Sequence, residues 1–296
     1  MIENFVRKVG AKWATVWLLT PMAVFGSAYF GFQAAIVLAT SVSLCVFAGC
    51  LSAYLDGKKM YLNPTSIITG LLIGMTVSPQ TPIYMLVVGA FTAELLIKAT
   101  CARGWLNPAV VGRAAIAILE TYDPITYADL STGASPLFKN ESGASEPIYL
   151  DALLGLTKGS IGETSAILLL ITGFLLLRYV VIKREAALTM LMAVPVVALI
   201  VPDAPDMIGH SPWTSDPILY IIAGPTLLMA FFFLTDPATL PKTKLGCVFV
   251  GLFVAVFAVV GRMHTSIAGV EMYGILVMNA ATPLINKLTI RNKQVV

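Results

Sequence analysis

The chain has little charge. Of its 296 residues only 12% are Asp, Glu, Lys or Arg, whereas 57% are hydrophobic, and the mean hydropathy is +0.85. A soluble domain carries about a quarter charged residues, so a water-soluble protein of this length would lack the polar side chains to cover its surface. This scarcity excludes a soluble enzyme and indicates an integral membrane protein.

Cysteine and histidine are also scarce. The four cysteines have no CxxC spacing, and the two histidines lack the spacing of zinc ligands. No GxGxxG, Walker or catalytic-triad signature occurs, and the net charge of +3 comes without a basic cluster interleaved with aromatics. These absences argue against a zinc, haem or iron–sulfur site and against a nucleic-acid partner.

Long apolar runs are abundant instead. A bilayer crossing needs about 20 apolar residues, and reading for such runs predicts an all-α polytopic protein with about ten transmembrane helices. The predicted stretches are 13–31, 33–55, 64–78, 82–100, 106–120, 165–182, 186–201, 217–235, 245–261 and 267–285. The third, fifth and seventh are short and bounded by proline, as in broken helices that line a site.

The basic residues support this count. With ten alternating spans, almost all Lys and Arg of the connections and termini fall on one side, and the acidic residues of the connections 121–163 and 202–216 fall on the other. Arg262 is the main exception. The positive-inside rule then places both termini in the cytoplasm.

The longest connection divides the chain. We expect a first five-helix repeat over 1–120, an extracytoplasmic loop over 121–164 and a second repeat over 165–296. Because each half has an odd number of spans, the two halves have opposite orientations in the membrane, as in an inverted repeat. Asn63-Pro64-Thr65 corresponds to Gly224-Pro225-Thr226, and Asn107-Pro108-Ala109 to Asn279-Ala280-Ala281.

A segment of small and hydroxylated residues, Gly159 to Ala166, joins the outer loop to the sixth stretch. Thr164 or Ser165 is expected to cap the following helix. A bare cap is one interpretation. The other is an anion site, since free backbone N–H groups and the helix dipole favour a phosphate there.

The segment Gly159 to Ala166 resembles the covalent flavin attachment segment of a membrane subunit shared by two redox-driven ion pumps. These are the Rnf complex, a ferredoxin:NAD oxidoreductase (D subunit), and the sodium-pumping NADH:quinone reductase (B subunit). Asn107-Pro108-Ala109, Thr235-Asp236-Pro237 and the stretch 276–285 resemble further motifs of that family. The chain length and short N-terminal segment favour the D subunit.

The resemblance implies FMN joined by a phosphoester bond to Thr164, which the topology places outside the cytoplasm, with Ser160, Gly162 and Ser165 as neighbours. Many family attachment sites read Ser-Gly-Ala-Thr, and this chain reads Ile161-Gly162-Glu163-Thr164. The family also implies a non-covalent riboflavin within the membrane part, for which Asn107 is a candidate contact. Implied partners are the other Rnf subunits, including a second flavin-bearing one, a flavin transferase and membrane lipids.

Ionisable residues within apolar stretches are candidates for an ion pathway, because a charge in hydrocarbon is costly. Glu94 lies inside the fourth stretch, one turn from Lys98, so a local ion pair is its plainer interpretation. Asp236 lies at the inner end of the eighth. Glu120, at the outer end of the fifth, is expected to be solvated or to cap a helix.

The resemblance therefore implies an electron-transfer subunit of a redox-driven pump in the cell membrane, carrying covalent FMN. Two alternatives stay open: an inverted-repeat solute channel of urea-transporter-like fold, because fold does not decide function, and a structural scaffold subunit. The cation moved, Na⁺ or H⁺, the terminal electron partners and a bacterial or archaeal source cannot be read from the sequence.

Overall fold

The structure is a computed structural model, and in the part of the chain that it describes all regular secondary structure is helical. The described residues are 2–97, 104–122, 148–155, 160–162, 165–180, 183–201, 217–222, 225–264 and 269–291.

The helices of the first half precede the long outer connection. They are α1 (Ile2–Val9), α2 (Ala11–Phe30), α3 (Phe32–Leu55), α4 (Pro64–Met75), α5 (Ile83–Phe91), the π-helical η1 (Thr92–Leu96) and α7 (Pro108–Tyr122). The helices that follow are α9 (Ile148–Leu154), α10 (Ala166–Tyr179), α11 (Glu185–Ile200), α12 (Pro217–Ile222), α13 (Thr226–Leu228), the π-helical η2 (Met229–Phe233), α14 (Lys244–His264) and α15 (Val270–Arg291).

Each of the ten predicted apolar stretches contains a helix. Three of these helices are long and apolar enough to cross a bilayer by themselves: α2, α3 and the Lys244–Arg262 part of α14. Shorter apolar helices are α4, α5 with η1, α10 and α11. The eighth stretch holds α12, α13 and η2 in place of one continuous helix. The helical fold is thereby confirmed and is consistent with a membrane protein, whereas ten crossings remain a prediction.

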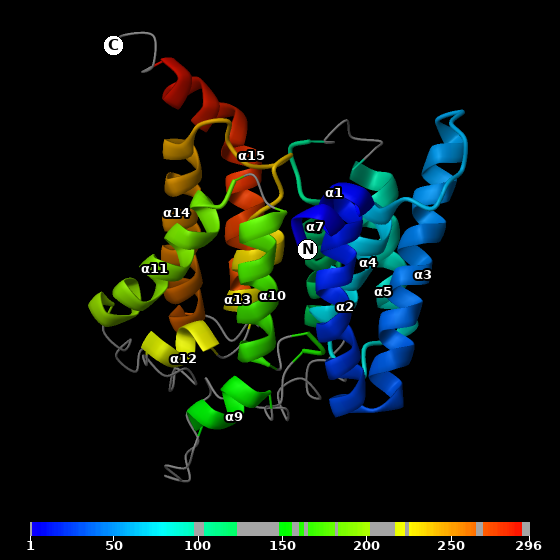
Figure 1. The fold of residues 1–296 in the computed structure, drawn as a ribbon, viewed down its shortest axis with the longest axis horizontal. Coiled ribbons are helices and arrows are strands. Elements are labelled where there is room, and N and C mark those ends of the chain that lie inside the picture. Colours follow the sequence, from blue (N-terminus) through cyan, green and yellow to red (C-terminus); the bar gives the residue numbers. More distant parts are fainter. Residues whose placement is uncertain are drawn as a thin grey trace.

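The helices form two groups that lie side by side (Figure 1). In the first group α3 packs on α4 and α5, α5 on α7, and α2 on α4. In the second, α11 packs on α12 and α14, α14 on α15, and α10 on α13. These four contacts join the same ordinal spans in both groups, although α2 also packs on α3 and, among the described residues, α10 has no equally extensive contact with α11. This agreement supports two related halves, and their inverted orientation stays a prediction.

The short helices begin where the sequence supplies a cap. The Asn63 side chain accepts a hydrogen bond from the Thr65 N–H (3.0 Å), and Pro64 occupies the first turn of α4, where its missing N–H costs nothing. Pro108 and Pro217 open α7 and α12 in the same way. The prolines that shorten these stretches in the sequence therefore mark helix starts.

Close helix packing depends on glycine. A Cβ on Gly70 of α4 would lie 2.6 Å from the Val42 Cα of α3, and one on Gly251 of α14 would lie 2.3 Å from the Ala186 carbonyl oxygen of α11. Small residues that let helix backbones approach are typical of membrane bundles, where packing rather than water drives association.

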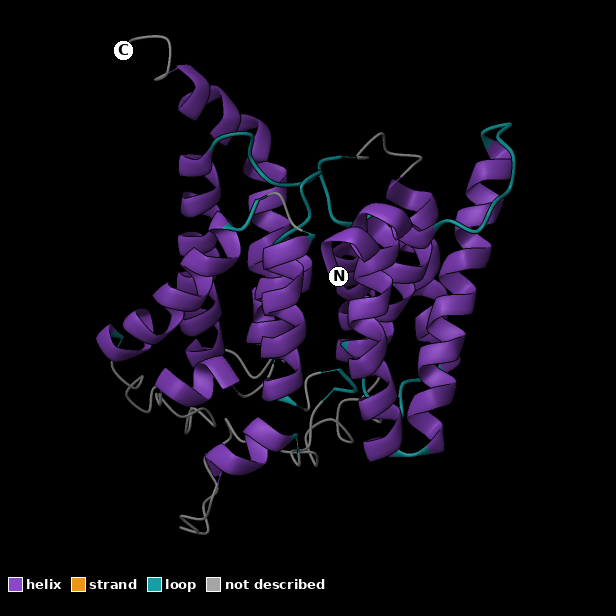
Figure 2. Cartoon of the chain, in the orientation of Figure 1, coloured by secondary structure: helices purple, strands orange, loops and turns teal. Residues whose placement is uncertain are grey.

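The two ends of the bundle differ in charge. The connections 56–63 and 234–243 lie at the end where α15 finishes, whereas α9, α12 and the start of α10 lie at the opposite end (Figures 1 and 2). The first end carries Lys58, Lys59 and Lys242 in these connections. We call it the basic end and the other the acidic end, because the acidic 121–163 connection leads to α10 there.

Candidate functional site

The candidate attachment segment is docked on the end of a short helix. The Gly162 N–H donates to the Met75 carbonyl (2.7 Å) and the Ile161 N–H to the Val77 carbonyl (3.3 Å). These carbonyls follow α4, whose last helical residue is Met75. Backbone pairing of this kind satisfies carbonyls that a helix end leaves free, so residues 160–162 complete the end of α4.

The segment 160–162 is tightly packed against its neighbours. A Cβ on Gly162 would lie 2.5 Å from the Met75 Cβ, and a Cβ on Gly26 of α2 would lie 2.1 Å from the Ile161 carbonyl oxygen. Ile161 is fully buried. Gly162, a predicted site residue, therefore has a packing role that only glycine can fill, and the segment is held between α2 and α4.

Ser165, one of the two residues expected to cap the helix, is the N-cap of α10. Its hydroxyl oxygen accepts a hydrogen bond from the Leu168 N–H (3.3 Å), and its O–H lies 3.4 Å from the Leu153 carbonyl. Ser160 differs, because its buried hydroxyl has no hydrogen-bond partner among the residues described. Thr164 itself, with Glu163, lies outside the described residues.

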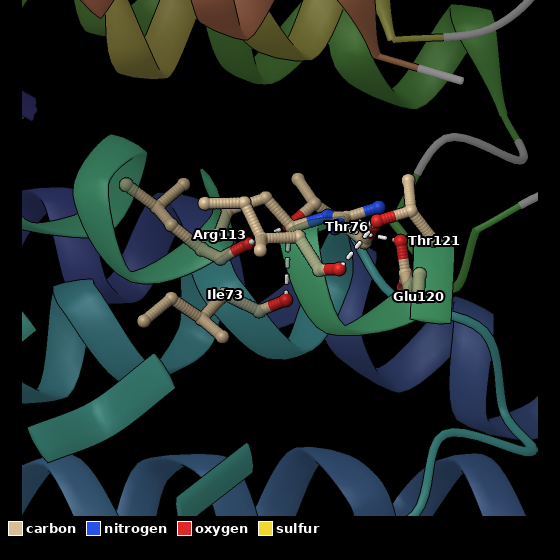
Figure 3. A network of polar contacts seen from close by, with 7 residues as sticks. Ile73, Thr76, Arg113, Glu120 and Thr121 are labelled. Carbon is tan, nitrogen blue, oxygen red and sulfur yellow. Dashed lines mark hydrogen bonds and ion pairs between the residues drawn. The ribbon is translucent and has the colours of Figure 1, made fainter. Parts of the chain in front are cut away.

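A buried ion pair lies directly behind this docking site. Arg113 of α7 donates from Nε to the Thr76 carbonyl (3.0 Å) and from Nη1 to Glu120 Oε2 (3.0 Å) (Figure 3). Thr76 stands between Met75 and Val77, the two residues that hold the segment. Three consecutive carbonyls are thus occupied in turn by Gly162, Arg113 and Ile161.

Glu120 corrects the expectation from sequence. It was expected to be solvated or to cap a helix, but its side chain is only 8% exposed and the Arg113 side chain 7%. The two residues are seven apart on α7, two helical turns, so both project from the same face. Removing one partner of such a pair leaves a buried charge uncompensated, at a cost of about 3–5 kcal/mol.

A second buried ion pair lies in the other half of the molecule. Arg262 of α14 pairs with Glu271 of α15, and their side chains are 2% and 0% exposed. Arg262 Nη2 also lies 3.1 Å from the hydroxyl of Thr226, the first residue of α13. Arg262, the exception to the charge bias, is therefore a core residue and not part of a polar connection.

Neither this cluster nor the role of Arg113 was predicted from the sequence. An arginine two turns before a glutamate within an apolar stretch was a usable signal for the pair on α7. Glu271 and Thr226 come from separate elements, so their meeting with Arg262 depends on tertiary packing that no local pattern encodes.

Asn107 connects the two halves at the start of α7. Its Oδ1 accepts from the Ala109 N–H (3.0 Å), and its Nδ2 donates to the Phe233 carbonyl at the end of η2 (3.2 Å). The residue is 5% exposed. Both the oxygen and the nitrogen of the side-chain amide are therefore hydrogen-bonded within the protein, which fixes the orientation of Asn107.

Asp236 lies three residues after Phe233, in the connection from η2 to α14. Its Oδ1 accepts from the Ala238 N–H (3.0 Å). Burial raises the pKa of the Asp236 carboxyl, an effect that the Ala238 hydrogen bond and the charge of Lys12 oppose. A carboxyl whose pKa is shifted by its surroundings is a candidate functional group.

Glu94 lies in the π-helical turn η1. Its Oε2 borders the space that a Gly49 Cβ would occupy, as does the Ser66 hydroxyl. The buried Ser66 hydroxyl has no hydrogen-bond partner within the described ranges. π-helical turns are frequent at functional sites. Lys98, the expected ion-pair partner of Glu94, lies outside the described residues.

The candidate residues do not form one site. Ser160, Gly162 and Ser165 lie towards the acidic end, and Asn107 and Asp236 towards the basic end, since α7 and η2 respectively begin and finish there (Figure 1). In the part of the chain that the structure describes, no three His, Cys, Asp or Glu side chains gather as a metal site would require.

Comparison with known proteins gives consistent matches. Residues 7–294 match the model of a family described as the NQR2, RnfD, RnfE family. The D subunit of the proton-translocating ferredoxin:NAD(+) oxidoreductase complex of Clostridium ljungdahlii is 30% identical, over 97% of this chain and 91% of that protein. The D subunit of the Na(+)-translocating complex of Acetobacterium woodii is 31% identical, over 92% and 86%. The B subunit of the Na(+)-translocating NADH-quinone reductase of Azotobacter vinelandii is 27% identical, over 79% and 62%.

Proposed function

The chain belongs to the NQR2, RnfD, RnfE family, and on that premise we propose that it is the membrane electron-transfer subunit of an Rnf-type complex that moves Na⁺ or H⁺ across the cell membrane. The observation that carries the proposal is the match over nearly the whole chain to relatives named as subunits of ion-translocating oxidoreductases. Its partners are then the other subunits of that complex. The relatives give no support to the solute-channel alternative.

The identity of the transported cation is not decided, because the relatives are named for different cations. Of two relatives with nearly equal identity to this chain, one is named for proton translocation and the other for Na(+) translocation. The buried polar side chains of this chain include carboxylates and hydroxyls, and oxygen ligands accept either cation.

We propose covalent FMN on a hydroxyl at the acidic end, with Thr164 as the acceptor that the resemblance indicates. When attached, FMN supplies a carrier that can pass electrons singly. Ser160 suits a polar contact to it, because its buried hydroxyl has no partner among the residues described. Ser165 does not, because its hydroxyl is used to cap α10.

A specific observation favours a second acceptor, Ser135. Ile161 and Gly162 before Thr164 are buried and hydrogen-bonded, and Ser165 and Ala166 after it are buried. A transferase must reach its acceptor, and the neighbours of Thr164 would have to leave their packed positions. Thr132-Gly133-Ala134-Ser135, in the outer connection, matches the Ser-Gly-Ala-Thr pattern with the two hydroxyl residues exchanged. This segment lies outside the described residues.

Two variants separate the acceptors. Thr164→Val and Ser135→Ala each remove one hydroxyl with little change of volume. Each is expressed with its complex and a flavin transferase, and flavin fluorescence of the chain is read on a denaturing gel. Loss in one variant alone identifies the acceptor, and retention in a variant that lacks both hydroxyls would refute covalent FMN at these sites.

Riboflavin within the membrane part remains a proposal, with Asn107 as a contact. The Asn107 amide is already held in place by the protein, so a ligand that binds to it loses less free energy in ordering the side chain. This is the support that the structure gives to a contact with riboflavin. Asn107→Leu is expected to lower non-covalent flavin in the purified complex, measured by extraction with acid, whereas the covalent flavin stays. Full retention of extractable riboflavin would remove Asn107 from the site.

For the topology we propose that the basic end faces the cytoplasm, with both termini there and the flavin acceptor outside. The clustering of Lys58, Lys59 and Lys242 in connections at that end supports it (Figure 1). Single cysteines introduced at Lys58 and Tyr149, in a background without the four native cysteines, test it. Labelling of the Lys58 site by an impermeant maleimide from outside the cell would overturn the assignment.

Glu94 and Asp236 are proposed as ion-pathway residues. Glu94→Gln and Asp236→Asn are expected to lower ion transport per electron in the intact complex, because each replaces a carboxylate that can hold a cation by a neutral amide. Unchanged transport in a variant would remove that residue from the pathway.

A further inference from the structure

The second half of the molecule buries a carboxylate that no part of the proposal above uses. Glu271 lies in the first turn of α15 and is 0% exposed, and Arg262 and Thr226 contact it from α14 and α13. We propose that Glu271 binds the monovalent cation that the complex moves, H⁺ or Na⁺, and that Arg262 is a built-in competitor for the same carboxylate. This inference rests on the proposed function and adds a site to it.

The two oxygens of Glu271 differ in their surroundings. Oε1 accepts from Arg262 Nη2 and lies 3.3 Å from the Thr226 hydroxyl. Oε2 is buried and has no hydrogen-bond partner in the described parts of the chain. A buried charged acceptor without a partner is costly. Oε2 is therefore the oxygen to which a proton or a cation adds.

Arg262 has interactions that do not depend on Glu271. Its Nη2 lies 3.1 Å from the Thr226 hydroxyl, and its guanidinium carbon lies 5.5 Å from the centre of the Tyr220 ring, on α12. A cation over an aromatic face is attracted to it. The arginine can therefore move off the carboxylate towards groups that still hold it, and its return expels the bound cation.

Such competition suits a site on a transport path. Binding must be strong enough to load the cation and weak enough to release it. With no cation, Arg262 neutralises Glu271, so neither state leaves an isolated negative charge in the interior. A carboxylate with no competing arginine would hold its cation more tightly.

The cluster lies where a helix is interrupted. α12 ends at Ile222 and the next helix, α13, begins at Thr226. Ion sites of transporters are typically built at discontinuous helices near the interface of the halves. Because Arg262 and Glu271 both contact Thr226, a change in their pairing acts directly on the first residue after the interruption.

The first half carries a similar arrangement, which is an independent instance. Arg113 pairs with Glu120 and donates to the Thr76 carbonyl at the end of the short helix α4. Glu120 Oε1 is likewise buried and has no partner in the described ranges. Each half therefore contains an arginine that pairs with a carboxylate and also contacts the end of a short helix. In both pairs one carboxylate oxygen has no partner in the described ranges.

The plainer interpretation is a structural clamp, since an acid in the first turn of a helix also stabilises it. The structural clamp and the cation site predict different effects on ion uptake when both charged residues are replaced by neutral ones. Exchanging a buried ion pair for neutral groups of similar size often keeps stability, but a neutral amide takes up no proton and offers Na⁺ no charged oxygen. The double variant therefore separates the two interpretations.

The experiment uses the whole complex in proteoliposomes, with ion uptake and electron transfer measured together. Glu271→Gln alone is expected to lower both the unfolding temperature and ion uptake, because the buried Arg262 charge then lacks its carboxylate. Adding Arg262→Gln is expected to restore the unfolding temperature but to leave ion uptake per electron at least tenfold below wild type. Wild-type uptake per electron in the double variant would overturn the cation site.

A second variant keeps the test valid if the double variant does not assemble. Glu271→Asp keeps the charge and moves the free oxygen by one methylene. We expect a shift of at least threefold in the Na⁺ concentration, or half a pH unit in the proton concentration, for half-maximal ion uptake. An unchanged dependence on both cations would overturn the proposal.

Failure of this inference is distinguishable from failure of the proposed function. Absence of electron transfer through the wild-type complex would refute the proposed function, whatever Glu271 does. Electron transfer coupled to normal ion uptake in the Glu271 variants would leave that function intact and refute only the cation site. Glu185→Gln serves as the matched control, because it removes a carboxylate that pairs with Lys244 outside this cluster.

Discussion

The pair of Arg113 and Glu120 allows a quantitative test of the structure. Arg113→Met removes the guanidinium and keeps an apolar chain of similar length. Glu120 is then a buried charge without its partner, and the Thr76 carbonyl loses its donor, so we expect a loss of about 3–5 kcal/mol. For a chain of this size that corresponds to a fall of roughly 10 °C in the unfolding midpoint.

The molecule contains its own probes for this measurement. Cys45 and Cys247 are free thiols that are 0% and 1% exposed, so a maleimide dye that fluoresces on reaction reports their exposure as the protein unfolds in detergent. Adding Glu120→Leu to Arg113→Met is expected to recover at least half of the lost midpoint, because no unpaired charge remains. A double variant as unstable as Arg113→Met alone would refute the account of this pair.

Three further outcomes follow from the geometry. Gly162→Ala is expected to lower the unfolding midpoint, because its Cβ would lie 2.5 Å from the Met75 Cβ. Adding Met75→Ala is expected to recover part of this loss, because it makes space for the new methyl group. An unchanged midpoint in Gly162→Ala would contradict the docking of the segment. Ser165→Ala is expected to cost about 1 kcal/mol as a lost N-cap, measured by the same dye, with Ser165→Asp as the control that keeps a capping oxygen. Since burial raises the pKa of Asp236 above its ordinary value, the group's stabilising contribution is present at low pH and is lost as pH rises through the folded-state pKa. The wild-type midpoint should therefore fall over that range more than the midpoint of Asp236→Asn, and parallel pH profiles would contradict this.

Much of the fold follows from the sequence because lipid imposes a simple constraint. Every backbone polar group in hydrocarbon must be paired within the chain, so long apolar runs become helices, and prolines such as Pro64 and Pro108 fix where they begin. The division of the eighth stretch around Pro225 was harder to foresee. Its hydrophobicity is continuous, and the hydroxyl of Thr226, the first residue of α13, meets partners on α14 and α15 that no local pattern encodes.

The site was less accessible to sequence reasoning. Ser165 could be predicted as a cap, because capping is a local interaction. The docking of residues 160–162 on α4 could not, because it pairs segments about 85 residues apart through backbone atoms that carry no sequence signal. Glu120 was misjudged for a related reason: proximity to a predicted interface suggests solvation, whereas Arg113 two turns earlier on α7 allows its burial.

The central claim is that this chain carries a covalently bound flavin in a redox-driven pump. The most direct measurement is the intact mass of the wild-type chain purified from its native complex, followed by peptide mapping. We expect a mass increased by FMN minus water, on the peptide that contains Thr164 or the one that contains Ser135. An unmodified mass in a complex that still transfers electrons would contradict the claim.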